Sequence, residues 1–297
     1  MPAEVLSQSQ IDDYNRDGFI VLENRIPVDI MDGVRAEIAR FVEEARGMTV
    51  SNDRIDLEDT HTPDAPRVRR IKLPHALSTV FETLMASDFI LAPVRDLIGP
   101  NLRLHTTKLN MKSAGFGAAV EWHQDWAFYP HTNDDVLAVG ILIDDMGAKN
   151  GPLQVFPGTH KGPIFDHHAD GFFAGAMDMD ASGLDFDDAI SLEGPAGSIS
   201  IHHGRIVHGS GLNRSVRDRR MMFIEITAAD AYPLCGTMSK FGTLEDFDAR
   251  LLCGQGTTQP RLEDVPVRIP APLPPAAGSI YEIQKQLKAR SFERILR

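Results

Sequence analysis

Short strand-like segments separated by turn residues recur through residues 102–228, and they restrict the possible folds more than any other feature. Some of these segments alternate polar and apolar residues and others are apolar runs, and both patterns, bounded by pairs such as Asn150-Gly151 and Pro157-Gly158, are typical of strands. The segments are residues 102–105, 106–111, 136–143, 153–156, 197–201, 205–208 and 221–227. The pattern predicts an all-β core, either a sandwich or a barrel.

Helical patterns precede this core. Ser7 begins a helix that ends at Asp17-Gly18, and an amphipathic helix follows Pro27. The other predictions for this part are a strand at residues 19–22, a polar loop at 47–66 and helices at 78–85 and 88–98.

Three segments within and beyond the core have distinct compositions. Residues 162–190 lack a clear period, which predicts a functional lid or a disordered insertion. Prolines at 260–275 predict an extended linker, and residues 279–296 predict an amphipathic helix that packs back on the domain or forms a homodimer contact. We expect one domain over residues 1–297, with a helical N-terminal part (1–100), a β core (101–230) and a C-terminal extension (231–297).

Net charge and cysteine content exclude several functions. The formal charge of −12 argues against nucleic acid and anionic membranes as partners, because both need basic surfaces. The two cysteines, Cys235 and Cys253, do not suggest a disulfide framework. No signal peptide and no run of about 18 apolar residues is visible. These features predict a cytoplasmic protein that acts on a small molecule.

A His-x-Asp pair, His123 and Asp125, is the first candidate for chemistry. Residues two apart on an extended segment face the same way, so the imidazole and the carboxylate can both bind one metal ion. Together they form two-thirds of the 2-His-1-carboxylate triad of non-haem Fe(II) oxygenases.

The chain downstream supplies partners for this pair. His208 lies at the end of a predicted strand beside glycines, and Ser210 shares its face. Arg219 begins the next strand, and a guanidinium suits bidentate binding of a carboxylate. The set therefore predicts a metal bound by His123, Asp125 and His208, with a carboxylate anchor nearby.

The other histidines carry weaker predictions. His202 and His203 are adjacent and face opposite sides of a strand, so only one can reach a metal, and polar filling is the simpler interpretation. His131 could line a substrate pocket, and the remaining candidates, His160, His167 and His168, could be loop or channel residues.

Residues 67–72 form a basic cluster in an acidic protein. Two interpretations remain open: a solvated strand edge, or cations directed at a dianionic ligand. Arg67, Arg69 and Arg70 could serve a phosphate group.

Three motifs, in order, resemble the phytanoyl-CoA dioxygenase family of Fe(II)/2-oxoglutarate-dependent oxygenases. The motifs are His123-Gln124-Asp125 with Tyr129-Pro130, Asn150-Gly151-Pro152-Leu153 leading to Pro157-Gly158-Thr159-His160-Lys161-Gly162, and His208-Gly209-Ser210-Gly211-Leu212-Asn213 with Arg219. The resemblance implies a mainly β fold with flanking helices and a double-stranded β-helix (jelly-roll, cupin-like) core.

The resemblance also implies roles for single residues. His123, Asp125 and His208 would bind Fe(II), and Arg219 with Ser210 would hold the far carboxylate of 2-oxoglutarate.

Further positions match the family less closely. Lys72 resembles a lysine that approaches the cosubstrate, and Lys108 occupies a pocket position where the family often has Met. Ile141 replaces a Trp of the family, which would make that cosubstrate contact apolar and smaller.

The implied activity consumes 2-oxoglutarate and O₂, releases succinate and CO₂, and hydroxylates an aliphatic carbon of a small organic or acyl-CoA substrate. Desaturation or epoxidation uses the same iron site. Aromatic residues beside the ligands would shape the substrate pocket or fill the core: Trp122, Trp126, Phe128 and Tyr129. Two alternatives are a non-catalytic jelly-roll binding protein, and a cupin-type isomerase or zinc enzyme that uses His202 or His203.

Overall fold

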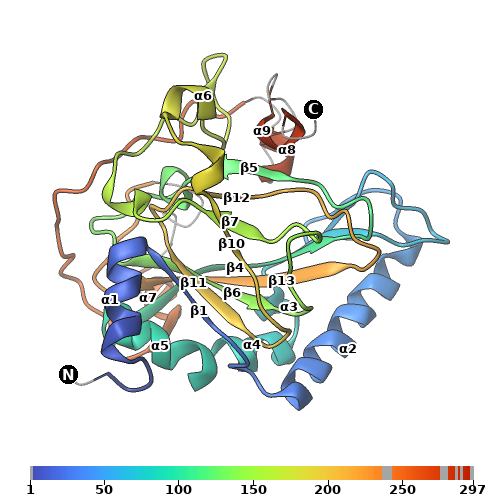
Figure 1. The fold of residues 1–297 in the computed structure, drawn as a ribbon. Helices are drawn as coiled ribbons and strands as arrows, with labels where there is room; N and C mark the ends of the chain where they lie inside the picture. The colour runs from blue at the N-terminus through green and yellow to red at the C-terminus, as the bar shows by residue number, and fades with distance from the viewer. Residues whose placement is uncertain (1–2, 236–242, 275–279, 285–286, 288–289, 295–297) are drawn as a thin grey trace.

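A large antiparallel sheet and a smaller one form the centre of the computed structural model, which describes residues 3–235, 243–274, 280–284, 287 and 290–294 (Figure 1). In spatial order, the large sheet contains β1 (Phe19–Leu22), β11 (Ile199–His203), β6 (Val136–Leu142), β13 (Arg219–Ala228), β4 (Leu102–Lys112), β3 (Val68–Lys72) and β2 (Ile55–Leu57), with β14 (Leu251–Cys253) paired to β4. The small sheet contains β10 (Ile190–Leu192), β7 (Leu153–Val155), β12 (His208–Ser210) and β5 (Val120–His123). The two strands β8 (His168–Ala169) and β9 (Phe172–Phe173) form a separate hairpin.

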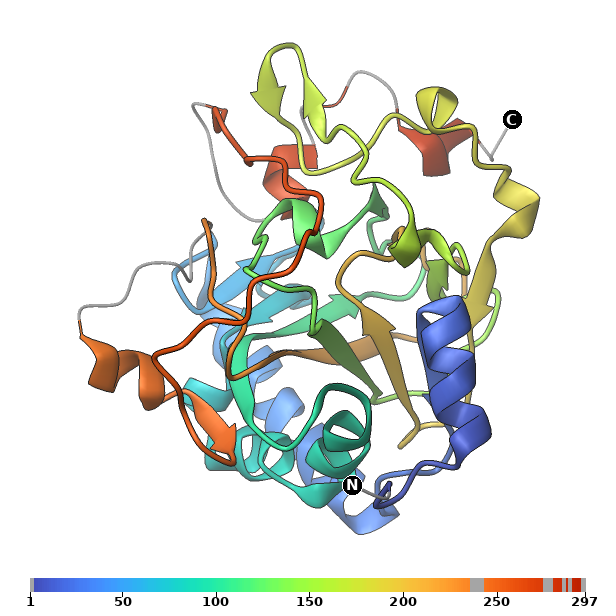
Figure 2. The same ribbon diagram turned by 90° about the vertical axis from the view of Figure 1, so that its left-hand side faces the viewer.

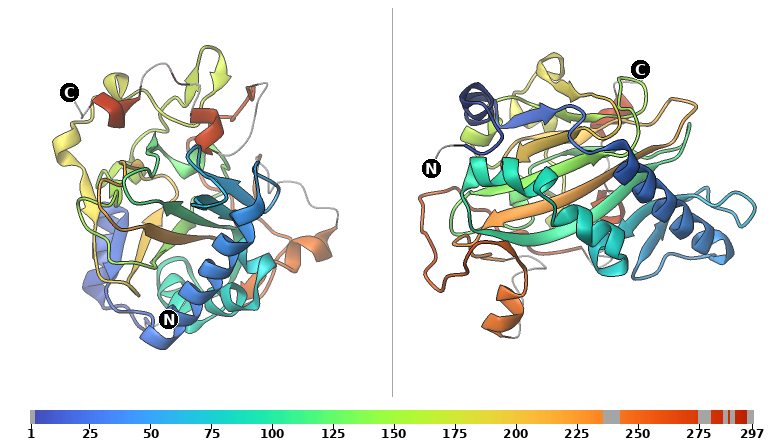
Figure 3. Two further views of the ribbon diagram at one scale, coloured as in Figure 1. Left: turned by 90° about the vertical axis from the view of Figure 1, so that its right-hand side faces the viewer. Right: turned by 90° about the horizontal axis from the view of Figure 1, so that it is seen from below.

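Helices from the N-terminal part cover the outer face of the large sheet (Figure 3). They are α2 (Val28–Glu44), α3 (Pro74–Leu77), α4 (Thr79–Met85) and α5 (Asp88–Ile98). The apolar stripe of α2 includes Val34, Ile38 and Phe41, and these side chains are fully buried against the sheet. This packing leaves the inner face of the large sheet free to meet the small sheet.

The first helix, α1 (Gln8–Asp17), is capped as predicted. Ser7 and Gln10 form a capping box at its start, and Gly18 ends it with φ of +83°, where a side chain would be strained. The chain then enters β1 directly, which adds a strand to the edge of the large sheet. The N-terminal part is therefore not only helical, because β1, β2 and β3 all extend this sheet.

Two segments predicted to be irregular contain ordered structure. The predicted loop at 47–66 contains β2, whose three residues are all buried. The insertion at 162–190 contains β8, β9, α6 (Met179–Ser182) and the 3-10 helix η4 (Phe186–Asp188). The other short helices are η1 (Ala45–Gly47), η2 (Asp125–Ala127), η3 (Thr159–Lys161) and α7 (Leu244–Asp248).

The described stretches of the C-terminal part lie on the outside of the core (Figure 2). The proline-rich segment is extended but bonded to the core: the indole of Trp126 donates to the carbonyl of Pro266, and the amide of Phe173 donates to that of Pro272. The helix predicted at 279–296 is two short helices within the described residues, α8 (Ile280–Gln284) and α9 (Ser291–Arg294), and both contact β5. The other parts of that prediction lie outside the described residues.

Among the helices that the structure describes, none is both long and apolar enough to cross a membrane.

Candidate active site

The predicted metal ligands meet at one end of the space between the two sheets. His123 is the last residue of β5, and Asp125 begins the helix η2 that follows it. β12 pairs with β5 so that His208 lies opposite His123. One ligand atom from each of the three side chains lies within 4.8 Å of the others. Two neighbouring strands and one turn therefore assemble the predicted set.

Both imidazoles are held in the orientation that a metal requires. Nδ1 of His123 lies 2.7 Å from the carbonyl oxygen of Glu121. Nδ1 of His208 lies 3.0 Å from the carbonyl oxygen of Ile206. A ring whose Nδ1–H donates to a carbonyl presents the lone pair of Nε2 to the metal. Burial lowers the pKa of His123 to about 4 and lowers that of His208 well below its ordinary value, so both rings are neutral at pH 7.

Asp125 supplies the negative charge. Its carboxylate oxygens lie 3.8 Å from Nε2 of His123 and 3.8 Å from Nε2 of His208. Burial opposes ionisation, but Lys108 and the imidazoles outweigh it and hold the pKa of Asp125 well below its usual range. Two neutral imidazoles and one ionised carboxylate are the donors of the iron-binding facial triad, so these residues fit the predicted metal.

A buried ion pair borders this end of the site. Nζ of Lys108 is 2.5 Å from Oε1 of Glu225 and 4.0 Å from Oδ1 of Asp125. Tyr129 lies beside these carboxylates, and burial together with their charges raises its pKa. A cation, an anion and a neutral hydroxyl therefore lie close to the metal ligands.

Arg219 lies at the other end, as the first residue of β13. The side chain is buried; Nε is 3.2 Å from Sδ of Met146, and Nη2 has no hydrogen-bond partner. In the part of the chain that the structure describes, no carboxylate forms an ion pair with Arg219. Burial lowers its pKa to about 10, so it remains a cation at pH 7. A buried guanidinium without a counter-ion fits an anionic ligand.

Lys112 lies opposite Arg219 on β4, and sequence reasoning missed it. Its side chain is fully buried, and Nζ donates to Oγ of Ser210 at 2.8 Å and to the carbonyl oxygen of Gly211. It thereby fixes the predicted Ser210 near Arg219. One signal was available: Lys112 shares the strand face of Lys108 and Asn110, but the predicted strand stopped at residue 111.

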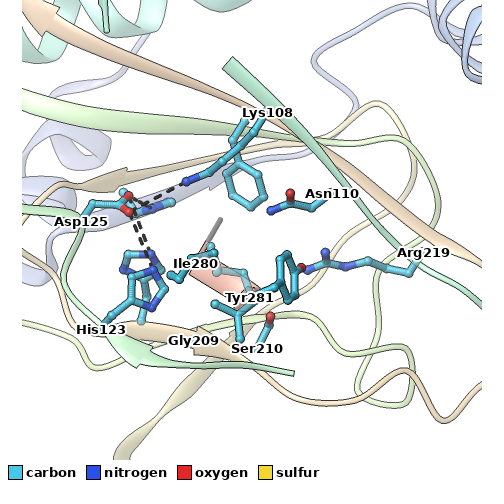
Figure 4. Close-up of a pocket in the computed structure, with 14 residues that line it drawn as sticks. Lys108, Asn110, His123, Asp125, Gly209, Ser210, Arg219, Ile280 and Tyr281 are labelled. Carbon is cyan, nitrogen blue, oxygen red and sulfur yellow. Dashed lines mark ion pairs between the residues drawn. The ribbon is translucent and has the colours of Figure 1, made fainter. Parts of the chain in front are cut away.

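One pocket joins the two ends (Figure 4). Figure 4 shows His123 and Asp125 at one side, Arg219 at the other, and Tyr281 between them beside the guanidinium. The lining residues are Lys108, Asn110, Val120, His123, Asp125, Leu153, His202, His208, Gly209, Ser210, Arg219, Phe223, Ile280 and Tyr281. A metal site and a lone cation at opposite sides of one pocket suit a ligand with two acidic ends.

The sequence model of the family described as phytanoyl-CoA dioxygenase (PhyH) matches residues 14–221, which contain the triad and Arg219. The chain belongs to this family.

Similar proteins support the same class. The probable alpha-ketoglutarate-dependent hypophosphite dioxygenase of Stutzerimonas stutzeri is 34% identical over 284 residues, 94% of this chain and 98% of that protein. The ectoine dioxygenase of Bordetella parapertussis is 27% identical over 247 residues, 75% of each chain. The crystal structure of EctD from S. alaskensis with bound Fe has a TM-score of 0.67 at 21% identity and covers 90% of each chain, which shows the fold.

The predicted family, the jelly-roll fold and the enzyme class are therefore confirmed. The chain is a dioxygenase of the kind that uses Fe(II), 2-oxoglutarate and O₂.

Two residues predicted as cosubstrate contacts do not line the pocket. Lys72 does not line the pocket; Nζ is 2.8 Å from Oδ1 of Asp56 and 2.8 Å from the carbonyl oxygen of Asn52. Ile141 faces away from the pocket, because on β6 it shares the face of Val139 and packs into the core beneath the helices. By contrast, Lys108 and Ser210 both line the pocket as predicted.

The aromatic residues divide into two groups. Trp122 and Trp126 fill hydrophobic clusters and do not line the pocket, so their substrate role is not supported. Trp122 precedes His123 on β5 and therefore faces the opposite side of the strand. Phe128 and Tyr129 do not line the pocket either, but the ring centre of Phe128 lies 5.9 Å from that of His123 and Tyr129 contacts the ion pair described above, so their substrate role stays a prediction.

His202 is closer to the site than polar filling implied. Nε2 lies 3.7 Å from Oδ2 of Asp125, and the ring lines the pocket. His203 faces the other side of β11, where Nε2 is 3.8 Å from Asp134. His131 is buried with Nδ1 2.7 Å from the carbonyl oxygen of Tyr129, and it does not line the pocket. His167 accepts a hydrogen bond from the amide of Gln124 and so supports the turn between the ligands.

Proposed function

We propose that His123, Asp125 and His208 bind Fe(II) and that Arg219, with Ser210, binds the far carboxylate of 2-oxoglutarate. One observation carries this proposal: a facial triad and a buried arginine without a counter-ion lie at opposite sides of one pocket. Iron and 2-oxoglutarate supply the activation of O₂. The chain's own residues orient the cosubstrate and keep its charged end out of water.

The arrangement assigns a task to each group. The carbonyls of Glu121 and Ile206 fix the two imidazoles. Lys112 holds Ser210 so that its hydroxyl lies beside the cosubstrate path. Lys108 offsets the charges of Asp125 and Glu225 next to the metal, and its ammonium borders the place where a substrate must approach.

We propose a small polar molecule as the substrate, with hypophosphite as the first candidate. The relative named for hypophosphite matches nearly the whole length of both chains. The groups nearest the triad are polar and charged, which suits a small ion better than a long acyl chain. Transfer of one O₂ atom into a P–H bond would convert hypophosphite to phosphite, while the other atom enters succinate as 2-oxoglutarate loses CO₂.

A zwitterionic substrate is the second candidate. Lys108 and Glu225 present opposite charges beside the metal ligands, and such a pair can bind an ammonium and a carboxylate. Relatives named for ectoine and L-proline match at 27% and 28% identity. For these substrates the reaction would hydroxylate a carbon atom. The net charge of −12 favours neither nucleic acid nor an anionic membrane as a partner.

The test is succinate release by the Fe(II)-loaded enzyme, with hypophosphite, ectoine, L-proline and an acyl-CoA offered separately. We expect hypophosphite to stimulate succinate release, with phosphite formed in equal amount and detected by ³¹P NMR. Stimulation by an amino acid instead would replace the first candidate with the second. Stimulation by the acyl-CoA alone would contradict both, and succinate release unchanged in Asp125→Ala would contradict the proposed iron site.

A further inference from the structure

Two buried donors face the carboxylate end of the pocket without a partner. Tyr281 is 4% exposed, and its hydroxyl has no hydrogen-bond partner among the described residues. Nη2 of Arg219 is also buried without a hydrogen-bond partner among the described residues. Buried polar groups are normally hydrogen-bonded, and leaving one unpaired is costly. Both residues line one pocket, and Figure 4 shows the hydroxyl beside the guanidinium, so one ligand can satisfy both.

The electrostatic surroundings favour an anion at this point. Arg70 and Arg219 are the cations that act most strongly on Tyr281. Arg70 lies on β3 opposite Asn110, which lines the pocket, and it has no ion pair within the described parts of the chain. Burial raises the pKa of Tyr281, so the hydroxyl stays protonated and can donate at neutral pH.

We infer that Tyr281 donates a hydrogen bond to the far carboxylate of 2-oxoglutarate and that α8 (Ile280–Gln284) thereby closes the cosubstrate pocket. The inference rests on the proposed function, in which Arg219 binds the same carboxylate. A hydroxyl and a guanidinium together offer the carboxylate donors from two directions. Because Tyr281 lies on α8, this helix adds a donor to the site that Arg219 and Ser210 of the core begin.

Specific contacts hold α8 over the pocket. Oε1 of Gln284 accepts from the amide of Glu121 at 2.9 Å, two residues before the ligand His123. Nε2 of Gln284 donates to the carbonyl of Gly175 at 2.7 Å. On the opposite flank, Arg69 forms an ion pair with Glu282 at 2.7 Å. These bonds orient α8 so that Tyr281 points inward.

Farther along, α9 packs on the same strand. The ring of Phe292 stacks on Trp122 with centres 5.1 Å apart, and Oε2 of Glu121 accepts from the amide of Ser291 at 2.8 Å. Both α8 and α9 therefore pack against β5, the strand that carries the metal ligand His123. A ligand that accepts a hydrogen bond from Tyr281 should stabilise this packing.

The experiment combines a matched pair of variants with a matched pair of ligands. The variants are Tyr281→Phe, which removes only the hydroxyl, and Tyr232→Phe, whose hydroxyl donates to the carbonyl of Thr257 away from the pocket. The ligands are 2-oxoglutarate and 2-oxopentanoate, which has the same five-carbon chain with a methyl group in place of the far carboxylate. Affinity is measured anaerobically with Fe(II) by the visible charge-transfer absorption, so turnover is not needed.

We expect Tyr281→Phe to bind 2-oxoglutarate about tenfold more weakly, because it loses one hydrogen bond to a charged group. Its affinity for 2-oxopentanoate should not change, and Tyr232→Phe should resemble the wild type with both ligands. Equal weakening for both ligands would contradict the inference, since the hydroxyl would then not distinguish the carboxylate. Tighter binding of both would mean that Tyr281 obstructs the pocket, which also contradicts it.

A second measurement tests closure without a variant in the pocket. Hydrogen exchange of the peptide covering residues 280–294 should slow when 2-oxoglutarate binds and should not slow with 2-oxopentanoate. Unchanged exchange with 2-oxoglutarate would overturn closure.

Failure of the proposed function gives a different result. The wild type would then show no charge-transfer absorption with 2-oxoglutarate, and Arg219→Gln would change nothing. If only the Tyr281 inference fails, the wild type still binds and Arg219→Gln still loses affinity.

Discussion

The two ends of the pocket are built differently. At the metal end, all three ligands come from β5, β12 and the turn after β5, and backbone carbonyls fix both imidazoles. At the carboxylate end, donors come from β4, β12, β13 and α8, and two of them, on Arg219 and Tyr281, have no partner in the described structure. The backbone therefore fixes both ligand imidazoles before any metal binds, whereas the carboxylate end depends on a ligand and on α8.

This difference separates what a motif encodes from what the topology assembles. A His-x-Asp pair and a histidine on the neighbouring strand specify the metal end locally. The carboxylate end needs side chains that are far apart in sequence, such as Lys112 and Tyr281. We therefore expect substitutions at the metal end to abolish activity, and substitutions at the carboxylate end to weaken 2-oxoglutarate binding by different amounts.

Loss of a metal ligand should have the largest effect. In Asp125→Ala the affinity for Fe(II) should fall by more than about 100-fold, because even outer partners of metal ligands contribute 10–100-fold. Metal retained after desalting, measured by elemental analysis, checks this. His203→Gln is the matched control, since His203 faces the other side of β11; an equal loss in that variant would show that folding, not ligation, was affected.

Loss of the buried guanidinium should come next. Arg219→Gln should raise the KM for 2-oxoglutarate by roughly 100-fold or more, because removing one member of a buried charge pair costs 2–5 kcal/mol or more. Arg220→Gln is the control on the same strand, since Arg220 pairs with Asp144 instead. Similar KM values in the two variants would contradict the proposal that Arg219 binds the far carboxylate of 2-oxoglutarate.

The ion pair beside the metal should affect stability more than cosubstrate binding. Lys108→Met leaves Glu225 buried without its partner and should lower the free energy of unfolding by roughly 3 kcal/mol. This lies at the low end of the usual range because Lys108 is 19% exposed. The double variant Lys108→Met/Glu225→Gln should recover much of this loss in denaturant titrations. A large rise in the KM for 2-oxoglutarate in the double variant would instead give Lys108 the cosubstrate role that its family position suggests.

Buried histidines behind the metal end should give the smallest effect, visible as pH dependence. Burial lowers the pKa of His131 to about 4, below its unfolded value of about 6.5. Its contribution is complete above about pH 6.5 and is lost as the pH falls toward 4, by up to about 1.4 kcal/mol per pH unit. In the metal-free protein, His131→Asn should therefore lose about 2 kcal/mol less stability than the wild type between pH 7 and pH 5. Identical pH dependence in the two proteins would show that His131 titrates normally.

The placement of the metal triad, Arg219 and Ser210 around one pocket could be predicted, because short motifs and strand parity put their side chains on matching faces. Strand parity could also have excluded Trp122, which is adjacent to His123 and so faces the other way. It failed for Ile141, because every residue of β6 is buried and the strand has no alternating pattern. The pairing of Lys72 with Asp56 was not predicted, because Asp56 lies on β2, a strand that the polar sequence of 47–66 conceals.

Other features had no local signal. Tyr281 is separated from Arg219 by a long stretch of chain, and no motif joins them. Glu225 lies within a largely apolar strand, and the partners of its buried carboxylate, Lys108 and Tyr129, come from other parts of the chain. The positions and partners of such residues depend on long-range packing, which cannot be seen in a single sequence.

The most direct test of the central claim is anaerobic titration of the Fe(II)-loaded protein with 2-oxoglutarate, followed by visible absorption. We predict a weak charge-transfer band that saturates in the wild type, is absent in Asp125→Ala, and needs far more 2-oxoglutarate in Arg219→Gln. A wild type that retains iron but shows no band, or a band unaffected by either variant, would contradict the account.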